Sequence, residues 1–203
     1  MATRGRPRTF DEDTALDGAM RVFWERGYEA SGVDDLAKAM GISMSTFYST
    51  FGDKEALFLS ALKRYEGEKR SYANAISTVD QPAAAAFQQL LNEAAHQLTR
   101  EDQPRGCMLT LALHNCSPEL EPLRRHLNDR RTASVDAFEL RLKAARSKGE
   151  LEKGTDIRSL AWFLVNTLQG MSLQARAGAT RKDLLKIGGW AMKAWPQRTG
   201  NDV

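Results

Sequence analysis

Apolar residues recur along the chain at spacings of three and four, and no stretch alternates between apolar and polar with a period of two. This spacing is typical of amphipathic helices and excludes a sheet-based fold. Gly27, Gly41 and Gly149 each follow one of the helical stretches, at the position where glycine commonly ends a helix. The pattern therefore predicts an all-α protein of about nine helices.

Residues 31–58, SGVDDLAKAMGISMSTFYSTFGDKEALF, predict two short helices separated by a tight turn and followed by the start of a third. Ser31 and Asp34 can satisfy the first free amides of a helix that begins near Val33. Gly41 is expected to end that helix, because glycine adopts the left-handed conformation without steric cost. This arrangement is typical of a helix-turn-helix.

The second short helix, over residues 44–50, is too short to be stable unless it packs against other elements. Phe47 and Phe51 lie four residues apart and can supply that packing, while Ser43 or Ser45 can cap its start. The outward positions carry hydroxyl groups and one phenol, on Ser45, Thr46, Tyr48 and Ser49. Such a surface suits phosphates and base edges.

The run GYEASGVDDLAKAMGISMSTFYSTFGDKEALF resembles the DNA-binding segment of the tetracycline-repressor (TetR) family. The preceding GRPR and AMRVFWERGY fit the same family, so the resemblance covers roughly residues 4–65. It implies a three-helix DNA-binding head on a larger helical ligand-binding and dimerisation body. It also implies a homodimer that binds a pseudo-palindromic double-stranded DNA operator, with the second helix of the motif in the major groove.

Carried over by position, the resemblance implies specific contacts with DNA. Phosphate contacts are expected from Ser31, Tyr48 and Lys54, and the residues expected to face the groove are Ser43, Met44, Ser45 and Thr46. Two positions depart from the family pattern: Gly32 stands where a second hydroxyl residue is common, and Met44 where a lysine is common.

Charge alone does not indicate a DNA-binding head. Residues 1–70 contain 11 Lys and Arg against 12 Asp and Glu, although the whole chain has a net charge of +3. The basic residues before Asp11 form one cluster, Arg4, Arg6 and Arg8. By composition this segment is either a flexible tail or an arm that reaches the minor groove or the DNA backbone, and its place beside a helix-turn-helix favours the arm.

No apolar run approaches the roughly 20 residues of a membrane span, and the first residues lack the apolar core of a secretory signal. We therefore expect a cytoplasmic protein with no membrane partner. The predicted organisation is an arm and helix-turn-helix domain over residues 1–53, a connecting helix and linker over 54–81, and a ligand-binding and dimerisation domain over 82–203. The connecting helix, over about 54–77, is predicted to act as the lever between the two domains.

Helical spacing continues through the body, with Pro82 expected at the first position of its first helix. In the long helix over about 118–148, four arginines alternate with acidic residues and predict a solvated face: Arg124, Arg125, Arg130 and Arg131. The last helix, over 184–195, carries Gly188, Gly189 and Ala191, which permit close approach of another helix. We therefore predict that the last two helices form a two-fold dimer interface, which a bulky residue at Gly188 would disrupt.

A ligand pocket is expected where apolar stretches of the body carry isolated polar residues. The predicted lining is Phe87, Leu91, Cys107, Met108, Leu111, His114, Phe138, Trp162, Asn166 and Gln169. Three of them, His114, Asn166 and Gln169, either orient a ligand or make ordinary core hydrogen bonds. Cys107 follows Gly106 at a helix start, where helix amides favour a reactive thiolate, although an inert buried thiol fits the same sequence.

Other chemistry finds little support. The three histidines have no carboxylate at ligand or triad spacing, and no glycine-rich phosphate loop occurs, so we expect no enzyme activity, metal or cofactor. Within one helix, Cys107 and Cys116 would lie roughly 13 Å apart, too far for a disulfide. The predicted function is a one-component repressor released from its operator by a small apolar or electrophilic ligand. The alternative is a small-molecule-binding helical protein without a DNA function.

Overall fold

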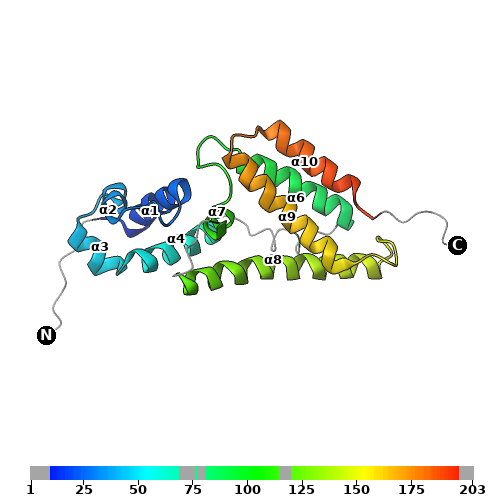
Figure 1. Cartoon of the computed structure of the whole chain (residues 1–203), viewed down its shortest axis with the longest axis horizontal. Helices are drawn as coiled ribbons and strands as arrows, with labels where there is room; N and C mark the ends of the chain where they lie inside the picture. Colours follow the sequence, from blue (N-terminus) through cyan, green and yellow to red (C-terminus); the bar gives the residue numbers. More distant parts are fainter. Residues whose placement is uncertain (1–9, 69–75, 77–80, 115–119, 197–203) are drawn as a thin grey trace.

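The computed structural model describes residues 10–68, 76, 81–114 and 120–196. These residues form nine helices and contain no strand, so the all-α prediction is confirmed for this part of the chain. Helices α1 to α4 form a head at one end of an elongated molecule, and α6, α8, α9 and α10 form the body (Figure 1). The short helix α7 lies between the two parts (Figure 1).

The head contains α1 (Glu12–Arg26) and the two predicted short helices, α2 (Val33–Met40) and α3 (Met44–Phe51). The carboxylate of Asp11 caps α1 by accepting a hydrogen bond of 3.0 Å from the amide of Asp13. The side chains of Phe23, Leu36 and Phe47 are almost completely buried, one from each helix. Gly41, with φ of 66°, ends α2 in the left-handed conformation as predicted.

The predicted cap of α2 is wrong. Gly32 occupies the N-cap position, and no side chain caps the helix there. Ser31 is fully buried, and its hydroxyl donates a hydrogen bond of 2.6 Å to the carbonyl oxygen of Gly27. The chain turns tightly before α2, where the amide of Ser31 also bonds the carbonyl of Tyr28. This turn directs Ser31 into the head instead of toward solvent.

Helix α4 (Lys54–Glu68) joins the head to the body, and Asp53 caps it through a 2.8 Å hydrogen bond from the amide of Ala56. Arg64 of α4 forms ion pairs with Asp13 and Asp17 of α1, so the two helices are tied together by charge as well as by packing. The predicted extension of this helix to residue 77 lies mostly outside the described residues. Within it, Ile76 is helical and buried.

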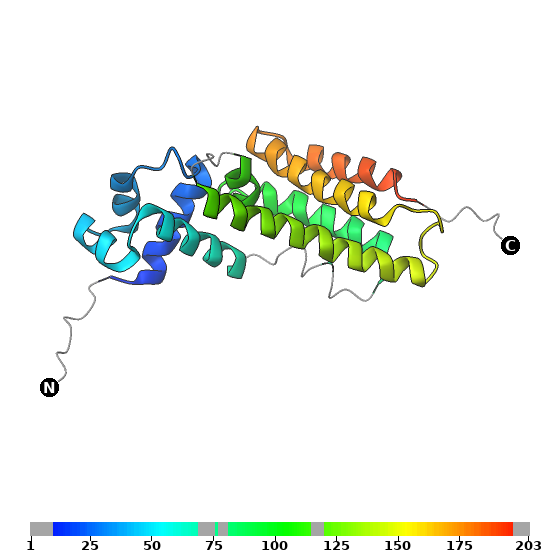
Figure 2. The ribbon, with the colours of Figure 1, turned by 60° about the horizontal axis from the view of Figure 1, so that its bottom comes forward.

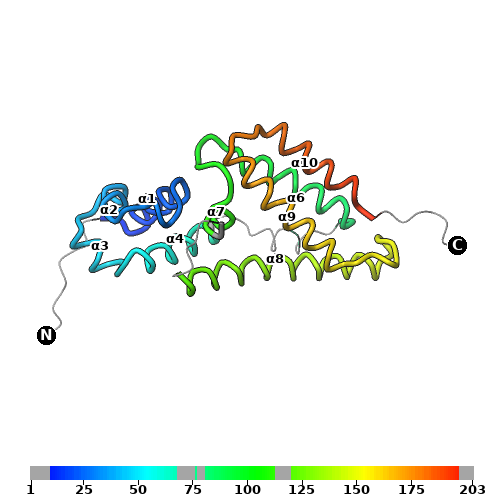
Figure 3. The backbone as a smooth tube through the Cα atoms, in the orientation of Figure 1, coloured from blue at the N-terminus to red at the C-terminus, as the bar shows by residue number. Residues whose placement is uncertain are grey.

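The body helices run alongside one another (Figure 2). In the core that they enclose, the rings of Phe87 and Phe138 pack edge to face with their centroids 5.0 Å apart. Helix α8 begins near the end of α4 and extends to the far end of the body (Figure 3). The bounds of the body helices are α6 (Ala83–Leu98), α7 (Met108–His114), α8 (Glu121–Ser147), α9 (Ile157–Arg176) and α10 (Arg181–Lys193).

Two helix starts differ from the prediction. Pro82 is the N-cap of α6 instead of its first residue, and the amide of Ala83 donates to the carboxylate of Glu150 at 2.6 Å. Helix α10 begins earlier than residue 184 because Thr180 and Asp183 form a capping box, which apolar spacing alone does not reveal.

Gly188 does not lie on the outer surface of α10. A Cβ atom at this position would stand 3.2 Å from Cβ of Leu91, so Gly188 allows α10 to pack closely on α6 within one protomer. The prediction that a bulky residue at Gly188 would separate two protomers is therefore wrong, since it would first disturb the protomer's own core. The outward faces of α9 and α10 carry larger exposed apolar residues, Phe163, Ile187 and Trp190.

Candidate functional site

Helix α3 presents a polar face to solvent because its apolar residues face the head. Phe47 is fully buried and anchors the helix, whereas the side chain of Tyr48 is 54% exposed. Ser43 is the N-cap: its Oγ accepts a 3.1 Å hydrogen bond from the amide of Thr46 and lies 2.9 Å from the hydroxyl of Thr46. Ser45 is also exposed. Hydroxyl groups thus cover the first turn of the helix.

The other residues predicted to contact DNA are not all exposed in the structure. Met44 is half-buried and packs partly against the head core. Ser31 does not present its hydroxyl to solvent, because that group is buried and donated to Gly27, so the predicted phosphate contact from this side chain is wrong in this conformation. The predicted arm residues lie outside the described residues, namely Arg4, Arg6 and Arg8.

Lys54, the first residue of α4, is held beside the helix-turn-helix by an aromatic ring. Its Nζ lies 4.4 Å from the centroid of the Tyr28 ring. The Tyr28 ring packs edge to face on the ring of Phe58, and the two ring centroids are 5.2 Å apart. Partial burial lowers the pKa of Lys54, and the carboxylate of Glu29 opposes that shift. A phosphate near this ammonium would favour its charged form further.

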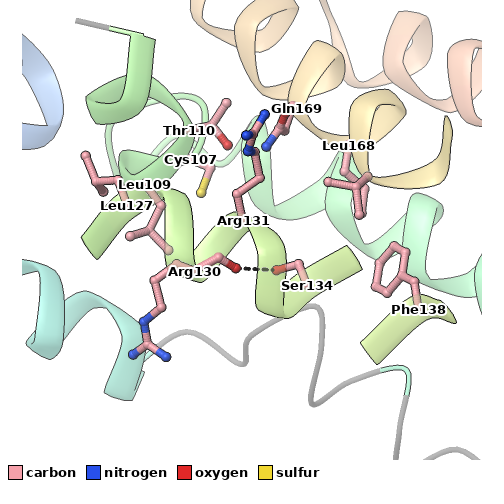
Figure 4. A pocket seen from close by; sticks show the side chains of 11 residues that line it. Cys107, Leu109, Thr110, Leu127, Arg130, Arg131, Ser134, Phe138, Leu168 and Gln169 are labelled. Carbon is pink, nitrogen blue, oxygen red and sulfur yellow. Dashed lines mark hydrogen bonds between the residues drawn. The ribbon is translucent and has the colours of Figure 1, made fainter. Parts of the chain in front are cut away.

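A cavity of about 80 Å³ lies in the body between α7, α8 and α9 (Figure 4). Of the predicted lining residues, the structure brings Cys107, Phe138 and Gln169 together there. The side chains that the prediction missed are Leu109, Thr110, Leu127, Arg130, Arg131, Ser134, Val165 and Leu168. The wall of the cavity is therefore largely apolar, and a few polar side chains contribute to it.

Several predicted ligand contacts lie elsewhere. Asn166 is exposed on the outside of α9, so its prediction as a cavity residue is wrong. Trp162 lies against the guanidinium groups of Arg131 and Arg158 instead of the cavity. The remaining buried residues belong to the packed core and not to the cavity wall, namely Phe87, Leu91, Met108 and Leu111. The side chain of His114 lies outside what the structure describes.

The arginines of α8 explain why the cavity was hard to predict. Arg124 and Arg125 form ion pairs with Glu121, and Arg130 pairs with Glu66 of α4, as expected for a solvated face. Arg130 and Arg131 both line the cavity, but only Arg131 has a buried Nε without a hydrogen-bond partner. The sequence pattern is the same for all four residues, so only the three-dimensional arrangement separates them.

The segment before α7 connects the cavity to the head. The indole nitrogen of Trp24 in α1 donates a 3.2 Å hydrogen bond to the carbonyl of Gly106. The next residue, Cys107, donates its amide to the hydroxyl of Ser172 in α9 at 2.8 Å and lines the cavity. Gly106 has φ of 85°, and a Cβ there would lie 2.9 Å from the carbonyl oxygen of Ser172. This segment therefore contacts both the head, through Trp24, and α9, through Ser172.

Comparison with known proteins identifies the family. A family described as "Bacterial regulatory proteins, tetR family" matches residues 15–61, and "Tetracyclin repressor-like, C-terminal domain" matches residues 83–185. The HTH-type transcriptional repressor ComR of Escherichia coli (strain K12) is 34% identical over 199 residues, which cover 96% of this chain and 93% of ComR. The chain belongs to the TetR family.

Two further TetR-family relatives agree. The HTH-type transcriptional repressor BdcR of Escherichia coli (strain K12) is 26% identical over 94% of this chain and 91% of BdcR. A cysteine-substituted variant of the TetR family regulator CifR, solved with 26 bp double-strand operator DNA, is 37% identical. It superposes with a TM-score of 0.88 over 95% of this chain and all of that one. Helices α2 and α3 are thus the helix-turn-helix of a TetR-family transcriptional regulator.

No helix in the described part of the chain has both the length and the apolar character needed to cross a lipid bilayer. No group of three or more His, Cys, Asp or Glu side chains among the described residues is arranged to hold a metal ion.

Proposed function

We propose that this TetR-family protein is a one-component transcriptional repressor. A homodimer binds a pseudo-palindromic operator, and a small molecule in the body cavity releases it. The observation that carries the proposal is the hydroxyl-covered face of α3 beside a positioned lysine at the start of α4. Base edges and phosphates are the groups that such a surface recognises.

A dimer is supported by the apolar surface that the last two helices expose. The exposed fractions of Phe163, Ile187 and Trp190 are 41%, 36% and 69%. Large exposed apolar side chains on adjacent helices are typical of protein interfaces. Two heads joined in this way must reach successive major grooves about 34 Å apart, so a movement of a few ångström is sufficient to weaken operator binding.

The structure also contains contacts able to transmit such a movement. Arg130, from the cavity helix α8, pairs with Glu66 of α4. Trp24 of α1 bonds the carbonyl of Gly106, which precedes the cavity residue Cys107. An effector that displaces α8 or the segment before α7 therefore acts on two helices of the head.

The proposal includes the division into residues 1–53, 54–81 and 82–203, a cytoplasmic location and the absence of enzyme activity. A mobility-shift titration with duplex DNA at several salt concentrations separates it from the alternative. A DNA-binding regulator gives a salt-dependent shift, whereas a small-molecule-binding protein without a DNA function gives none at any salt concentration.

We predict that Tyr48→Phe and Lys54→Ala weaken binding to operator and to scrambled duplex alike, because phosphate contacts carry no sequence information. Loss of a hydrogen bond to a charged group corresponds to about tenfold in affinity or more. The slope of log affinity against log salt should fall by about 1 per half-site for Lys54→Ala.

The matched control for these variants is Thr46→Ala, which removes a hydroxyl from the groove-facing side of α3. It should change the ratio between operator and scrambled duplex. If Tyr48→Phe altered only that ratio, Tyr48 would be a base-reading residue instead.

We predict that covalent filling of the cavity releases the operator. N-ethylmaleimide is a suitable probe, because the Cys107 thiolate adds across its double bond and the proton ends on carbon. Wild type and Cys116→Ser should lose operator binding in mobility-shift assays, while Cys107→Ser should keep it. An equal response of Cys107→Ser would show that this thiol has only a packing role.

A further inference from the structure

The cavity of the body has one polar side. Figure 4 shows the guanidinium of Arg131 directed toward Gln169, with Thr110 and Cys107 close by. The neighbouring Arg130 turns the other way, toward α4, and pairs there with Glu66 (Figure 4). The rest of the lining is mainly aliphatic or aromatic, with Leu109, Leu127, Phe138, Val165 and Leu168. A single cationic group thus faces an apolar space.

Arg131 differs from the other arginines around it. Arg124, Arg125 and Arg130 are paired with glutamates, and Arg158 of α9 is paired with Asp136 and Glu139. Among the described residues, Arg131 has no acidic partner, and its buried Nε has no hydrogen-bond acceptor. The guanidinium lies over the ring of Trp162, with its carbon 5.2 Å from the ring centroid.

A buried donor on a charged group without an acceptor is unfavourable, because the group loses water and gains no replacement. A guanidinium also presents its N–H groups in a fork that matches the two oxygens of a carboxylate. The side-chain amide of Gln169 can donate a further hydrogen bond to such an oxygen. The polar side of the cavity is therefore suited to a planar anion.

We propose that the cavity binds a small carboxylic acid as its carboxylate, with the oxygens on Arg131 and Gln169 and the apolar part against Leu127, Phe138 and Leu168. The size of the cavity limits the ligand. A protein cavity of about 150 Å³ holds benzene, which has as many heavy atoms as a four-carbon acid. The cavity of about 80 Å³ must therefore widen to hold an acid of that size, and larger acids are excluded. A phosphate dianion fits less well, since only one unpaired cation lines the cavity.

This inference rests on the proposed function only in that the bound carboxylate acts as the effector. Arg131 follows Arg130 directly in α8, and Arg130 holds Glu66 of α4. An anion bound to Arg131 therefore acts on the turn of α8 that contacts α4.

The test measures binding without DNA, by calorimetry and thermal shift, with butyrate and isobutyrate at millimolar concentrations. Their uncharged amides, butyramide and isobutyramide, serve as probes of the same shape. The carboxylates should bind and raise the melting temperature, and the amides should bind at least tenfold more weakly. Arg131→Gln should weaken butyrate binding at least tenfold, and Arg131→Lys should retain part of it.

Arg125→Gln is the matched control, because it removes the same charge from an exposed position of α8 and should leave butyrate binding unchanged. Arg131→Met provides a second readout: it should raise the melting temperature of the ligand-free protein, since it removes an uncompensated charge. A purely structural Arg131, stacked on Trp162, would give a lower melting temperature instead.

Equal binding of amide and carboxylate, unchanged binding by Arg131→Gln, or no binding of either acid would overturn the carboxylate site. Failure of the proposed function looks different. If butyrate binds through Arg131 but mobility-shift assays show no release of operator, the site stands and its effector role does not. If operator is released by an uncharged ligand alone, the repressor function stands and the carboxylate site does not.

Discussion

Phe163→Asp and Trp190→Asp should each convert the protein from a dimer to a monomer and lower its operator affinity by about a hundredfold or more. Both side chains are exposed on the last two helices, at 41% and 69%. In the proposed dimer they become buried, and a carboxylate left there without a partner is strongly unfavourable. A monomer engages one half-site, so the affinity gained by linking two heads is lost.

Sedimentation velocity measures the oligomeric state, and a mobility-shift titration measures the affinity. The matched control is Leu140→Asp, because Leu140 of α8 is also 69% exposed. This variant should remain dimeric and bind the operator normally. Monomers from Leu140→Asp, together with intact dimers from the other two variants, would place the interface on α8 and contradict the proposal.

The helix-turn-helix could be predicted because its signals are local. Ser43 caps α3 through the amide three residues ahead, and Asp53 caps α4 in the same way. Gly41 ends α2 in a conformation that glycine adopts easily. Each signal depends on residues within a few positions, and a sequence shows those directly. The wrong prediction at Ser31 also concerns residues a few positions apart. The tight turn before α2 directs the Ser31 hydroxyl toward the carbonyl of Gly27, and the spacing of residues in the sequence does not show this direction.

The cavity could not be predicted in the same way, because residues far apart in the chain form it. Cys107, Phe138 and Gln169 were identified as polar or aromatic residues on apolar stretches. Arg131 was not, because an arginine among acidic residues has the same pattern whether it faces solvent or a cavity. The orientation of α9 relative to α8 determines which side chains face the cavity, and it leaves Asn166 exposed on the outside.

The close approach of two helices also depends on residues that are far apart in the sequence. Ala37, a small residue of α2, is buried in the head. A close approach of α1 and α2 occurs at Gly18 of α1, where a Cβ would lie 2.5 Å from the carbonyl oxygen of Ala39. Nothing in the sequence near Gly18 indicates this contact, since its partner is a backbone atom of another helix.

Gly18→Ala should destabilise the head and weaken operator binding. The added methyl would stand 2.5 Å from a backbone oxygen, which has no rotamer to relieve the clash. A clash this short with a backbone atom lies in the upper part of the range for overpacking, at about 2–3 kcal/mol, and this outweighs the gain in helix propensity of about 1 kcal/mol. A net loss of about 1–2 kcal/mol corresponds to a fall in melting temperature of roughly 2–8 °C. Because α2 must move away from α1, α3 also loses its position relative to α4.

The control for Gly18→Ala is Gly67→Ala in α4, where the new methyl group meets no atom within 4 Å. Both substitutions gain the same helix propensity, so their difference isolates the clash between α1 and α2. Gly67→Ala should leave the melting temperature unchanged or raise it, and operator affinity should stay at the wild-type value. Equal melting temperatures for the two variants, measured by circular dichroism, would show that α1 and α2 have room for a methyl group. The close crossing would then contribute nothing to the geometry of the helix-turn-helix.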